Sequence, residues 1–453
     1  MTLHGKATRI NLFDFRSPQM RAFHMSWFAF FLCFFAWFGI APLMKVVREE
    51  LALTPAQVGN TIIASVAVTV LARLAIGWLC DRIGPRLAYT GLLLLGSIPV
   101  MCIGLADSYT TFLLFRLGIG VIGASFVITQ YHTTLMFAPN VVGTANATTA
   151  GWGNLGGGVT QMAMPVLFAT IVGLGMTEAV SWRASMVIAG ALCALTGVAY
   201  YFLTQDTPEG NFKDLKARGV EIGTKKSAQG TFLEACRDYR VWALFVIYAA
   251  CFGIELTINN VAALYFADYF ELNLATAGTV AALFGLMNIF ARTLGGVFGD
   301  KFGAKRGLKG RVQWLFIALF VEGLALMLFS RMDLLPVAIG TLLLFSLFTQ
   351  MSEGATFSVV PFINKRALGS VAGIVGAGGN AGAVAAGFLF KGELAWPTAL
   401  LILGAAVTAA SFLAFAVRFS PEAEAAAREE REARLREAAG VAPAAEPVPA
   451  LAA

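Results

Sequence analysis

Two arginines occupy corresponding places in long apolar stretches of the chain. Arg73 and Arg292 stand 219 positions apart and share the frame Arg-x3-Gly-x3-Asp, in which the acids are Asp81 and Asp300. An unpaired guanidinium at the centre of a membrane helix costs about 2.5–3.5 kcal/mol, so it persists there only beside a polar or anionic partner. Each aspartate lies about 12 Å further along the helix than its arginine. With no nearer acid on the same helical face, the pattern predicts that a bound anion is the partner of both arginines.

The chemistry of the guanidinium narrows the kind of anion. Arginine presents a planar fork of N–H donors, which matches a planar oxyanion better than a point charge does. Arg73 and Arg292 fall in the first and second halves of the chain, so two forks from opposite halves can hold one small ion between them. We therefore expect an anion clamp made of both arginines.

Two titratable residues, Glu255 and His132, also fall inside apolar stretches. Carriers that couple to protons commonly use such groups, so we consider both as proton-coupling residues, Glu255 before His132. Each has a structural alternative: Glu255 can balance excess positive charge, and His132 can be a hydrogen-bonded interior histidine.

The composition places these residues in a membrane. Hydrophobic residues make up 58% of the chain and charged ones only 13%, against about 25% charged in soluble domains, and the mean hydropathy is +0.72. Stretches long enough to cross about 30 Å of hydrocarbon predict an all-α membrane protein with twelve spans, near residues 24–44, 59–80, 87–106, 111–137, 144–174, 182–204, 240–266, 274–299, 312–330, 334–361, 369–390 and 396–417.

The distribution of lysine and arginine predicts the orientation. With both termini on the cytoplasmic side, most of these residues lie on inner segments, and the outer ones are Lys45, Arg48, Arg183, Arg331 and Lys391. The net charge of +6 therefore follows from topology and gives no reason to expect nucleic acid as a partner. Arg116 falls in a span near the membrane surface, where we expect a structural or snorkelling role.

The six cysteines are scattered, without a CxxC pair or a histidine cluster, so we expect neither a metal site nor disulfides, and no cofactor.

An internal repeat divides the chain. Shifting the sequence by 219 positions aligns Gly77 with Gly296 and Gly84 with Gly303, as well as the two arginines and the two aspartates. We therefore expect two six-helix halves, 1–204 and 240–418, joined by a cytoplasmic linker, 205–239. Such halves place a substrate site at their interface and alternate its access by rocking. The remaining residues, 419–453, are expected to form a solvated, partly disordered tail because they lack a core-forming pattern.

The loop after the second span resembles a known signature. The segment 77–86, Gly-Trp-Leu-Cys-Asp-Arg-Ile-Gly-Pro-Arg, is similar to the loop motif of the major facilitator superfamily, and 296–306 is a second copy. The resemblance implies the fold of that superfamily. It also implies a gating role, in which charged loop residues latch one conformational state: Asp81, Arg82, Asp300 and Lys301. The alternative is solvated loop charge, because surface ion pairs stabilise little.

Two glycine-rich segments identify a family. Residues 150–159, Ala-Gly-Trp-Gly-Asn-Leu-Gly-Gly-Gly-Val, and 373–383, Gly-Ile-Val-Gly-Ala-Gly-Gly-Asn-Ala-Gly-Ala, resemble the two nitrate signatures of the nitrate/nitrite porter family. Four other stretches resemble especially the high-affinity nitrate carriers: 20–27, 130–131, 253–260 and 353–361. The resemblance implies nitrate and nitrite as substrates and a substrate-binding set consisting of Arg73, Arg292, Asn154, Tyr248, Phe126, Phe252, Gly123, Gly153, Gly379 and Asn380. Close helix packing is the structural alternative for the glycines, and ordinary packing is the alternative for the aromatics.

These observations predict a secondary transporter that moves nitrate, and nitrite, across the inner membrane of a bacterium by alternating access. No GxxxxGK[ST] motif for ATP is present, so uphill movement must use an ion gradient or exchange. We expect nitrate/proton symport by a monomer surrounded by lipid, with nitrate/nitrite antiport as the alternative. A nitrate-binding membrane sensor is a third interpretation, and we do not expect an enzyme because no nucleophile and base stand together.

Overall fold

The computed structural model describes residues 5–137, 141–219, 228–364, 368–392 and 394–438. In these ranges all the extended regular elements are helices. The first half contains α1 (Pro18–Trp37), η1 (Ala41–Leu43), α2 (Met44–Glu50), α3 (Pro55–Ile83), α4 (Pro85–Cys102), η2 (Ile103–Leu105), α5 (Tyr109–Ile119), η3 (Gly120–Ala124), α6 (Ser125–Met136), α7 (Val142–Gly173) and α8 (Glu178–Leu203).

The linker and the second half follow the same helical plan. Two short helices, α9 (Phe212–Ala217) and α10 (Ala228–Arg237), lie between the halves in sequence. The second half contains α11 (Tyr239–Tyr269), α12 (Leu274–Leu286), η4 (Met287–Ile289), α13 (Ala291–Phe329), α14 (Leu335–Val359), η5 (Val360–Phe362), α15 (Leu368–Gly387), η6 (Phe388–Phe390), α16 (Trp396–Ser411) and η7 (Phe412–Ala416), and α17 (Pro421–Ala438) follows it.

Local sequence signals explain where several of these helices begin. Ser17 caps α1 by accepting a hydrogen bond from the Met20 backbone, and a proline occupies the first helical position. Thr54 and Gln57 form a reciprocal capping box at the start of α3, which also opens with proline. Such caps satisfy N–H groups that have no partner inside the helix, and proline fits the first turn because it lacks an N–H.

Eleven helical stretches in the described part of the chain are long and apolar enough to cross a membrane. One of them, Leu274–Phe329, has 56 residues, or about 84 Å at 1.5 Å per residue, and it contains both of the sequence-predicted spans 274–299 and 312–330. Gly307 interrupts it with a φ of 69°, so this stretch provides two crossings. The twelve-span prediction therefore agrees with the structure.

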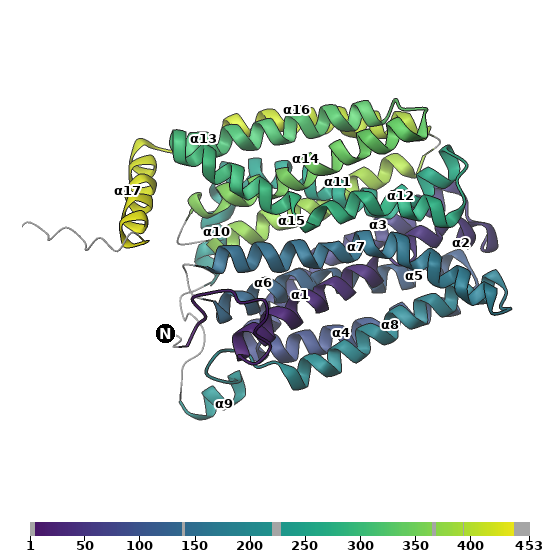
Figure 1. Ribbon diagram of the computed structural model, residues 1–453, viewed down its shortest axis with the longest axis horizontal. Helices are drawn as coiled ribbons and strands as arrows, with labels where there is room; N and C mark the ends of the chain where they lie inside the picture. The colour runs from purple at the N-terminus through teal and green to yellow at the C-terminus, as the bar shows by residue number, and fades with distance from the viewer. Residues whose placement is uncertain (1–4, 138–140, 220–227, 365–367, 393, 439–453) are drawn as a thin grey trace, which may run out of the picture.

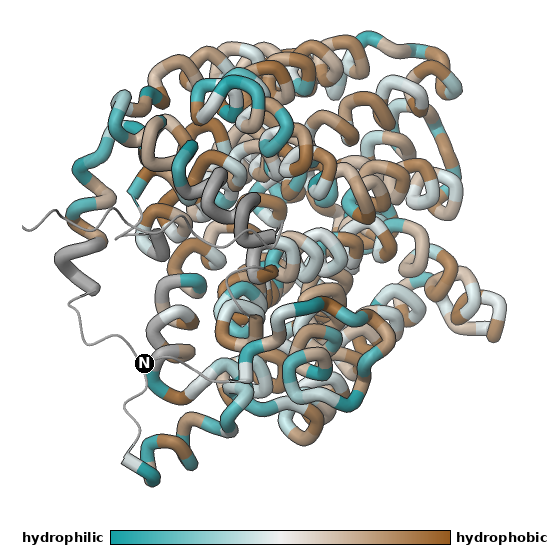
Figure 2. The backbone as a smooth tube through the Cα atoms, turned by 60° about the vertical axis from the view of Figure 1, so that its left-hand side comes forward, coloured by the Kyte–Doolittle hydropathy of each residue, from teal (hydrophilic) through white to brown (hydrophobic). Residues whose placement is uncertain are grey.

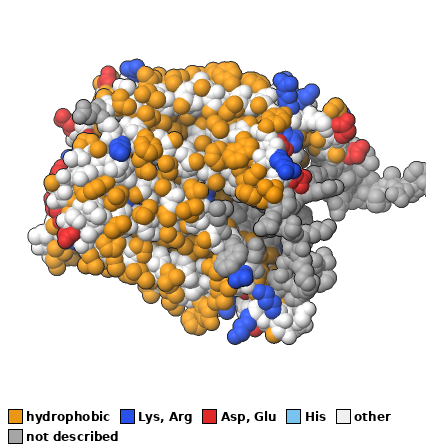
Figure 3. Space-filling model, turned by 180° about the vertical axis from the view of Figure 1, so that it is seen from behind, with side chains coloured by type: hydrophobic (Ala, Val, Ile, Leu, Met, Phe, Trp, Pro, Cys, Tyr) orange, Lys and Arg blue, Asp and Glu red, His pale blue; other side chains and the backbone are white. Residues whose placement is uncertain are grey.

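The two halves lie against each other as separate bundles. In Figure 1 the second half, drawn in green to yellow, lies above the first half, drawn in purple to teal. We call the end of the molecule that carries α9, α10 and α17 the inner end, and the opposite end, which carries α2, the outer end (Figure 1). Hydrophobic residues run along the helices, with hydrophilic ones concentrated toward the ends of the bundle (Figure 2). One face of the molecule carries a broad hydrophobic surface, with most charged side chains at its ends (Figure 3).

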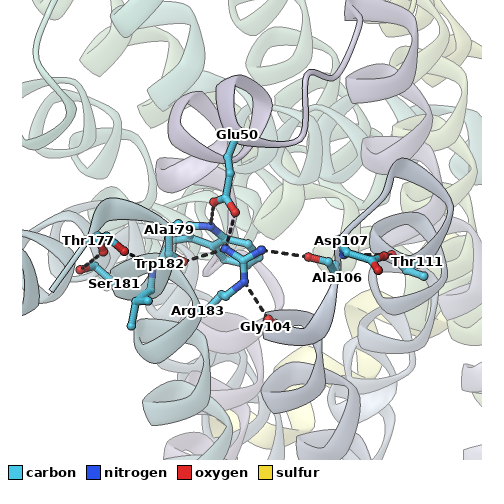
Figure 4. A network of polar contacts seen from close by, with 11 residues as sticks. Glu50, Gly104, Ala106, Asp107, Thr111, Thr177, Ala179, Ser181, Trp182 and Arg183 are labelled. Carbon is cyan, nitrogen blue, oxygen red and sulfur yellow. Dashed lines mark hydrogen bonds and ion pairs between the residues drawn. The ribbon is translucent and has the colours of Figure 1, made fainter.

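The outer end of the first half is held by one arginine, Arg183 on α8 (Figure 4). Its Nη1 lies 2.5 Å from Glu50 Oε1, its Nε donates to the Gly104 carbonyl at 2.8 Å, and its Nη2 donates to the Ala106 carbonyl at 3.0 Å. The indole of Trp182 donates to the second oxygen of Glu50 at 2.5 Å. These contacts fasten α2, η2 and the start of α8 to one another.

The two halves contain matching turns, although not at the aligned glycines. Gly84 (φ 87°) separates α3 from α4, and Gly307 (φ 69°) interrupts α13. The 219-position shift aligns Gly84 with Gly303, and the turn in α13 lies four residues beyond that aligned glycine. Only glycine adopts such left-handed backbone without strain. In the first half, Asp206 accepts hydrogen bonds from the backbone N–H of Arg86 at 2.8 Å.

In the second half, the corresponding acid comes from α17. Glu424 accepts hydrogen bonds from the backbone N–H groups of Leu308 at 2.8 Å and Lys309 at 3.0 Å. The start of α17 thus contacts α13 through Glu424, because these two N–H groups open a helical segment and bind a carboxylate well. Residues 439–453 lie outside the described part of the chain.

Arg116 is buried, with 1% of its surface exposed. Its Nη2 donates to Asn260 Oδ1 at 2.9 Å and its Nη1 to the Trp37 carbonyl at 3.3 Å. The snorkelling interpretation is therefore wrong and the structural one is correct, because Arg116 bridges α5 of the first half to α11 of the second.

Candidate functional site

Arg73 of α3 lies between the two halves and is only 9% exposed. Its Nη1 donates to the carbonyl of Gly376 on α15, in the second half, at 3.1 Å. Its guanidinium carbon lies 5.5 Å from the ring centre of Phe126 and 5.8 Å from that of Phe252. Nε and Nη2 have no hydrogen-bond partner among the described residues. A buried cation with two free donors is costly unless an anion or polar ligand completes its shell.

Arg292 of α13 has internal partners. Its Nη1 lies 2.5 Å from Glu353 Oε2 on α14, and its Nη2 donates to the Tyr248 hydroxyl at 2.9 Å. The expectation that neither arginine has an internal acid is therefore wrong for Arg292. The reasoning considered only acids on the same helix, whereas Glu353 reaches the arginine from a neighbouring helix.

Glycines bring that neighbouring helix close enough. A side chain at Gly354 of α14 would collide with the Arg292 carbonyl, and one at Gly295 of α13 would collide with the Met351 carbonyl. The two backbones therefore pack directly against each other, as small residues allow in membrane bundles. This approach places Glu353 beside Arg292.

The two arginines face one aromatic ring. The guanidinium carbon of Arg292 lies 5.9 Å from the ring centre of Phe252, so Phe252 has a guanidinium from each half within 6 Å of it. Tyr248 stacks on Phe252 with ring centres 5.2 Å apart, and Phe357 meets Tyr248 edge-on at 5.1 Å. The ring face carries negative potential and attracts both cations. The aromatics therefore hold two like charges near each other, and this concentration of positive charge suits an anion.

Glu255 is fully buried in the same cluster. Its Oε1 accepts a hydrogen bond from Asn288 Nδ2 at 2.7 Å, and its Oε2 accepts a longer one from Asn154 Nδ2 at 3.4 Å. Its carboxyl group also interacts with that of Glu353. Asn154, which belongs to the predicted substrate set, therefore touches the predicted proton-coupling residue.

The glycines of the predicted set lie at close packing contacts. A side chain at Gly123 would collide with the Trp37 ring, one at Gly153 with the Phe30 ring, and one at Gly379 with the Phe252 ring. Each glycine thus lets an aromatic ring approach a helix backbone. Gly379 does so for the ring that faces both arginines, so its packing role also shapes the site.

Asn380 is fully buried on α15, and neither atom of its amide has a hydrogen-bond partner among the described residues. Gly376 and Asn380 are four positions apart and therefore share one face of that helix. Asn380 therefore lies one helical turn beyond Gly376, whose carbonyl accepts the hydrogen bond from Arg73.

His132 lies elsewhere, near the inner end of α6. Its Nδ1 is 2.6 Å from the Tyr200 hydroxyl, and its Nε2 is 2.8 Å from the Gln205 carbonyl. Because a carbonyl only accepts, Nε2 carries the proton and Nδ1 accepts from the tyrosine. A neutral imidazole is fully satisfied here, which matches the structural alternative for His132.

The charged loop residues lie outside the cluster. Asp300 pairs with Arg311 of the same helix at 2.6 Å while its side chain is 70% exposed, and Lys301 lies over the Phe298 ring at 5.6 Å. Arg82 is exposed, and its carbonyl accepts a hydrogen bond from Lys216. The side chain of Asp81 lies outside the described residues. The ion pair of Asp300 with Arg311 joins two segments of one half.

Sequence reasoning missed Glu353, Asn288 and Phe357. Glu353 is a buried acid in a predicted span, so the argument that selected Glu255 applies to it equally. Asn288 lies in η4, a turn of 3-10 helix before α13, and no sequence signal distinguished it. In the described ranges no group of three histidine, cysteine or acidic side chains is arranged as a metal site.

Comparison with known proteins identifies the family. The family model of the Major Facilitator Superfamily matches residues 26–363. The chain is 42% identical to the high affinity nitrate transporter 2.5 of Arabidopsis thaliana, over 85% of this chain and 76% of that protein. It is 31% identical to the nitrate/nitrite transporter NrtP of Picosynechococcus sp., over 81% of this chain and 84% of that protein.

The fold is shared with a solved transporter structure. The crystal structure of a bacterial homolog to the human lysosomal transporter Spinster, inward-facing and unoccupied, matches with a TM-score of 0.68 and 17% identity, over 89% of this chain and 99% of that one. The predicted fold class is thus confirmed, and the family model and the relatives confirm the expectation of a transporter rather than an enzyme. This multi-pass membrane protein belongs to the major facilitator superfamily and, within it, to the family of high-affinity nitrate and nitrate/nitrite transporters.

Proposed function

We propose that the chain moves nitrate, and also nitrite, across the cytoplasmic membrane of a bacterium by alternating access. The observation that carries this proposal is the pair of buried guanidinium groups, one from each half, that lie within 6 Å of the Phe252 ring centre. Arg73 offers two free donors there, and a planar oxyanion accepts from such a fork in a bidentate manner. The names of the relatives agree with this substrate.

The remaining members of the site support the anion in different ways. Phe126 and Phe252 flank Arg73 and provide flat surfaces for a flat ion. The hydroxyl of Tyr248 orients Arg292. The free amide of Asn380 supplies a further donor one turn beyond Gly376. A nitrate ion held by both arginines bridges the halves, so its binding and release are tied to their relative movement.

The contacts between the halves support alternating access. Arg48 and Asp268 form a bidentate ion pair at 2.7 and 2.9 Å near the outer end. Gln161 donates to the Asn259 carbonyl at 2.6 Å, and Gly158 of α7 meets Gly285 of α12 backbone to backbone. In the proposed cycle these contacts close the outer side while the anion exchanges with the inner side.

Proton symport is the coupling that we propose first. Glu255 supplies a buried acid in direct contact with Asn154 and Glu353. Nitrate/nitrite antiport is the alternative, because the positive charge of Arg73, which has no acid beside it among the described contacts, opposes the return of an empty carrier and thereby favours exchange. In either mode the carrier works as a monomer with both termini cytoplasmic, and Asp81, Arg82, Asp300 and Lys301 act in gating at the inner end.

Reconstitution into liposomes tests the proposal and separates the two couplings. Under symport, a pH gradient that is acid outside should drive nitrate accumulation into empty vesicles. Under antiport, accumulation should require vesicles preloaded with nitrite. An absence of uptake in both arrangements would refute nitrate transport.

Arg73→Lys is the matching variant. Lysine keeps the charge but loses the fork, so nitrate affinity should fall by about 1.5–3 kcal/mol, roughly 10- to 160-fold. Arg331→Lys, which changes an exposed arginine in an outer loop, should transport normally. Near-normal affinity of a correctly inserted Arg73→Lys variant would remove Arg73 from the clamp.

A further inference from the structure

The ion pair between Arg292 and Glu353 creates a competition at the anion site. The Nη1 atom of Arg292 is 2.5 Å from Glu353 Oε2, so an ionised Glu353 occupies part of the fork that the anion clamp needs. Both side chains are buried, at 8% and 0% exposure. Nitrate and the Glu353 carboxylate are therefore two anions that compete for the guanidinium of Arg292.

Glu353 also touches a second carboxyl group. The side chains of Glu255 and Glu353 interact directly, and both are fully buried. Two carboxylates this close repel each other, so an ionised Glu353 depends on Arg292 as its counter-ion. The ion pair places the negative charge of Glu353 beside the positive charge of Arg292.

The surroundings provide little else to compensate that charge. The charged or titratable groups that face Glu353, among the described residues, are Arg292 and Glu322 from α13, and Tyr248, Cys251 and Glu255 from α11. Arg292 is the one cation in this set. Glu322 lies near Ser352 and Thr349, whose hydroxyls donate to the carbonyls of Phe348 and Phe345, and it has no ion pair with Arg292 among the described contacts.

We propose that Glu353 is the residue through which proton binding controls nitrate binding: protonating it releases Arg292, and nitrate then takes its place on the guanidinium. This proposal rests on the proposed nitrate transport and deepens it. One proton adds to Glu353, its carboxylate becomes neutral, and Arg292 stays protonated throughout. The buried charge is the same before and after, because nitrate replaces the carboxylate.

The arrangement gives reciprocal coupling. A proton on Glu353 favours nitrate binding, and bound nitrate favours protonation of Glu353 to the same extent, as linkage requires. On the inner side, release of nitrate leaves Arg292 unpaired, which favours loss of the proton from Glu353 and restores the ion pair. Each nitrate ion then crosses the membrane together with the one proton that Glu353 carries.

The test measures proton uptake during nitrate binding. Isothermal titration calorimetry of the purified full-length carrier, in two buffers with different ionisation enthalpies, reports protons taken up per nitrate. Wild-type protein should take up protons, and its nitrate affinity should weaken as pH rises, by at most about tenfold per pH unit where the competent form becomes rare. The Glu353→Gln variant should bind nitrate without proton uptake and with an affinity independent of pH.

Two further variants sharpen the outcome. Glu322→Gln removes a neighbouring buried acid and should leave proton uptake intact. Glu255→Gln leaves Glu353 on Arg292, so uptake should persist with an altered pH dependence. If proton uptake survives in Glu353→Gln or disappears only in Glu255→Gln, the assignment to Glu353 is overturned.

The wild-type titration separates this inference from the proposed function, and it does not depend on the folding of any variant. Nitrate binding without proton uptake by the wild type overturns the role of Glu353 and leaves nitrate transport standing. Failure of the wild type to bind nitrate at all refutes the proposed function itself. Glu353→Gln also serves as a negative control for pH-driven transport. The variant should continue to exchange labelled for unlabelled nitrate, but it should no longer accumulate nitrate under a pH gradient.

Discussion

At the scale of single residues, the two arginines of the repeat are not equivalent. Arg73 donates to one backbone carbonyl and keeps two donors free among the described contacts, whereas Arg292 is held by a carboxylate and a hydroxyl. A duplicated motif thus carries two different electrostatic environments. We expect the free donors of Arg73 to be available to the anion in the empty carrier. The Arg292 donor that Glu353 occupies should become available only after Glu353 is neutralised.

The amides near the arginines permit a sharper prediction. Asn380→Ala removes a buried amide with no partner among the described residues, so the thermal stability of the empty carrier should stay unchanged or rise, since an unsatisfied buried group destabilises by about 1–3 kcal/mol. If the amide serves the ion, nitrate affinity should fall by about 1.5–3 kcal/mol. Thermal unfolding and nitrate titration of the same preparation measure both effects.

Asn154→Ala is the control for this prediction. It removes the hydrogen bond that Asn154 donates to Glu255, so it should lower stability as well as change nitrate binding. An Asn380→Ala carrier that is less stable but binds nitrate with unchanged affinity would show that the amide at 380 serves packing.

Sequence reasoning succeeded for residues whose neighbours lie on their own helix and failed for partners on other helices. The burial of Arg73, Arg292 and Glu255 follows from their places in apolar spans. The pairing of Arg292 with Glu353 depends on how α13 and α14 cross, which periodicity does not specify. The prediction therefore identified the cation and missed its counter-ion.

At the scale of elements, an acid caps the start of a helical segment in each half. In both halves this acid belongs to the part of the chain that follows the last span. Asp206 serves Arg86 and Phe212, at 2.8 and 2.9 Å, and is 1% exposed. Glu424 serves Leu308 and Lys309 from the tail helix. The repeat thus extends to a polar contact that the 219-position alignment did not contain.

The two caps should differ in their contribution to stability. Asp206→Ala leaves buried N–H groups without an acceptor, so it should lower the free energy of unfolding by about 1–3 kcal/mol. Of the N–H groups that bind Glu424, the one on Leu308 is part-buried and the one on Lys309 is exposed. Water can replace the carboxylate more easily there, so Glu424→Ala should have an effect near the lower part of the range for helix caps, about 0.5–1 kcal/mol. Thermal denaturation in detergent, with transport assayed in parallel, compares them, and an equal loss from both variants would contradict the argument from burial.

At the scale of the whole molecule, polar contacts and close glycine crossings join the halves toward their outer ends. Arg48 with Asp268 and Arg116 with Asn260 connect different halves. The matching fold of an inward-facing transporter has the same two-bundle design. We therefore expect the outer contacts to set the balance between the two access states.

Arg48→Gln should shift that balance toward the state that is open at the outer end. An ion pair of this partly exposed kind contributes at most about 1 kcal/mol, so the shift should be roughly two- to fivefold. The rate at which an impermeant maleimide labels an Asn259→Cys side chain, in a background without the six native cysteines, measures it. Asn259 reaches Gln161 through its backbone carbonyl, so this contact survives the substitution.

Arg183→Gln provides the matched control for the labelling experiment. Arg183 pairs with Glu50 within the first half at similar exposure, 25% and 26%, against 27% and 21% for Arg48 and Asp268. It should leave the labelling rate unchanged. Equal acceleration by both variants would indicate general loosening of the outer end, and no acceleration by Arg48→Gln would exclude this pair as a lock between the halves.

The sequence by itself determined the class of the protein, its spans and its duplication, and it indicated the residues that we propose for the anion site. These properties follow from hydropathy, which acts over about 20 neighbouring residues, and from motifs that repeat along the chain. The glycine segments identified the family for the same reason, because a sequence signature consists of consecutive residues.

Only the tertiary structure decided which side chains meet. The contacts of Glu353 with Arg292, of Arg116 with Asn260, and of Glu424 with the break in α13 each join residues that are distant in sequence. Such contacts depend on helix crossings and on where glycine lets backbones touch, and neither quantity is contained in the periodicity of one helix. For that reason the sequence located the positive charge of the site, and the packing of helices determined which carboxylate competes for it.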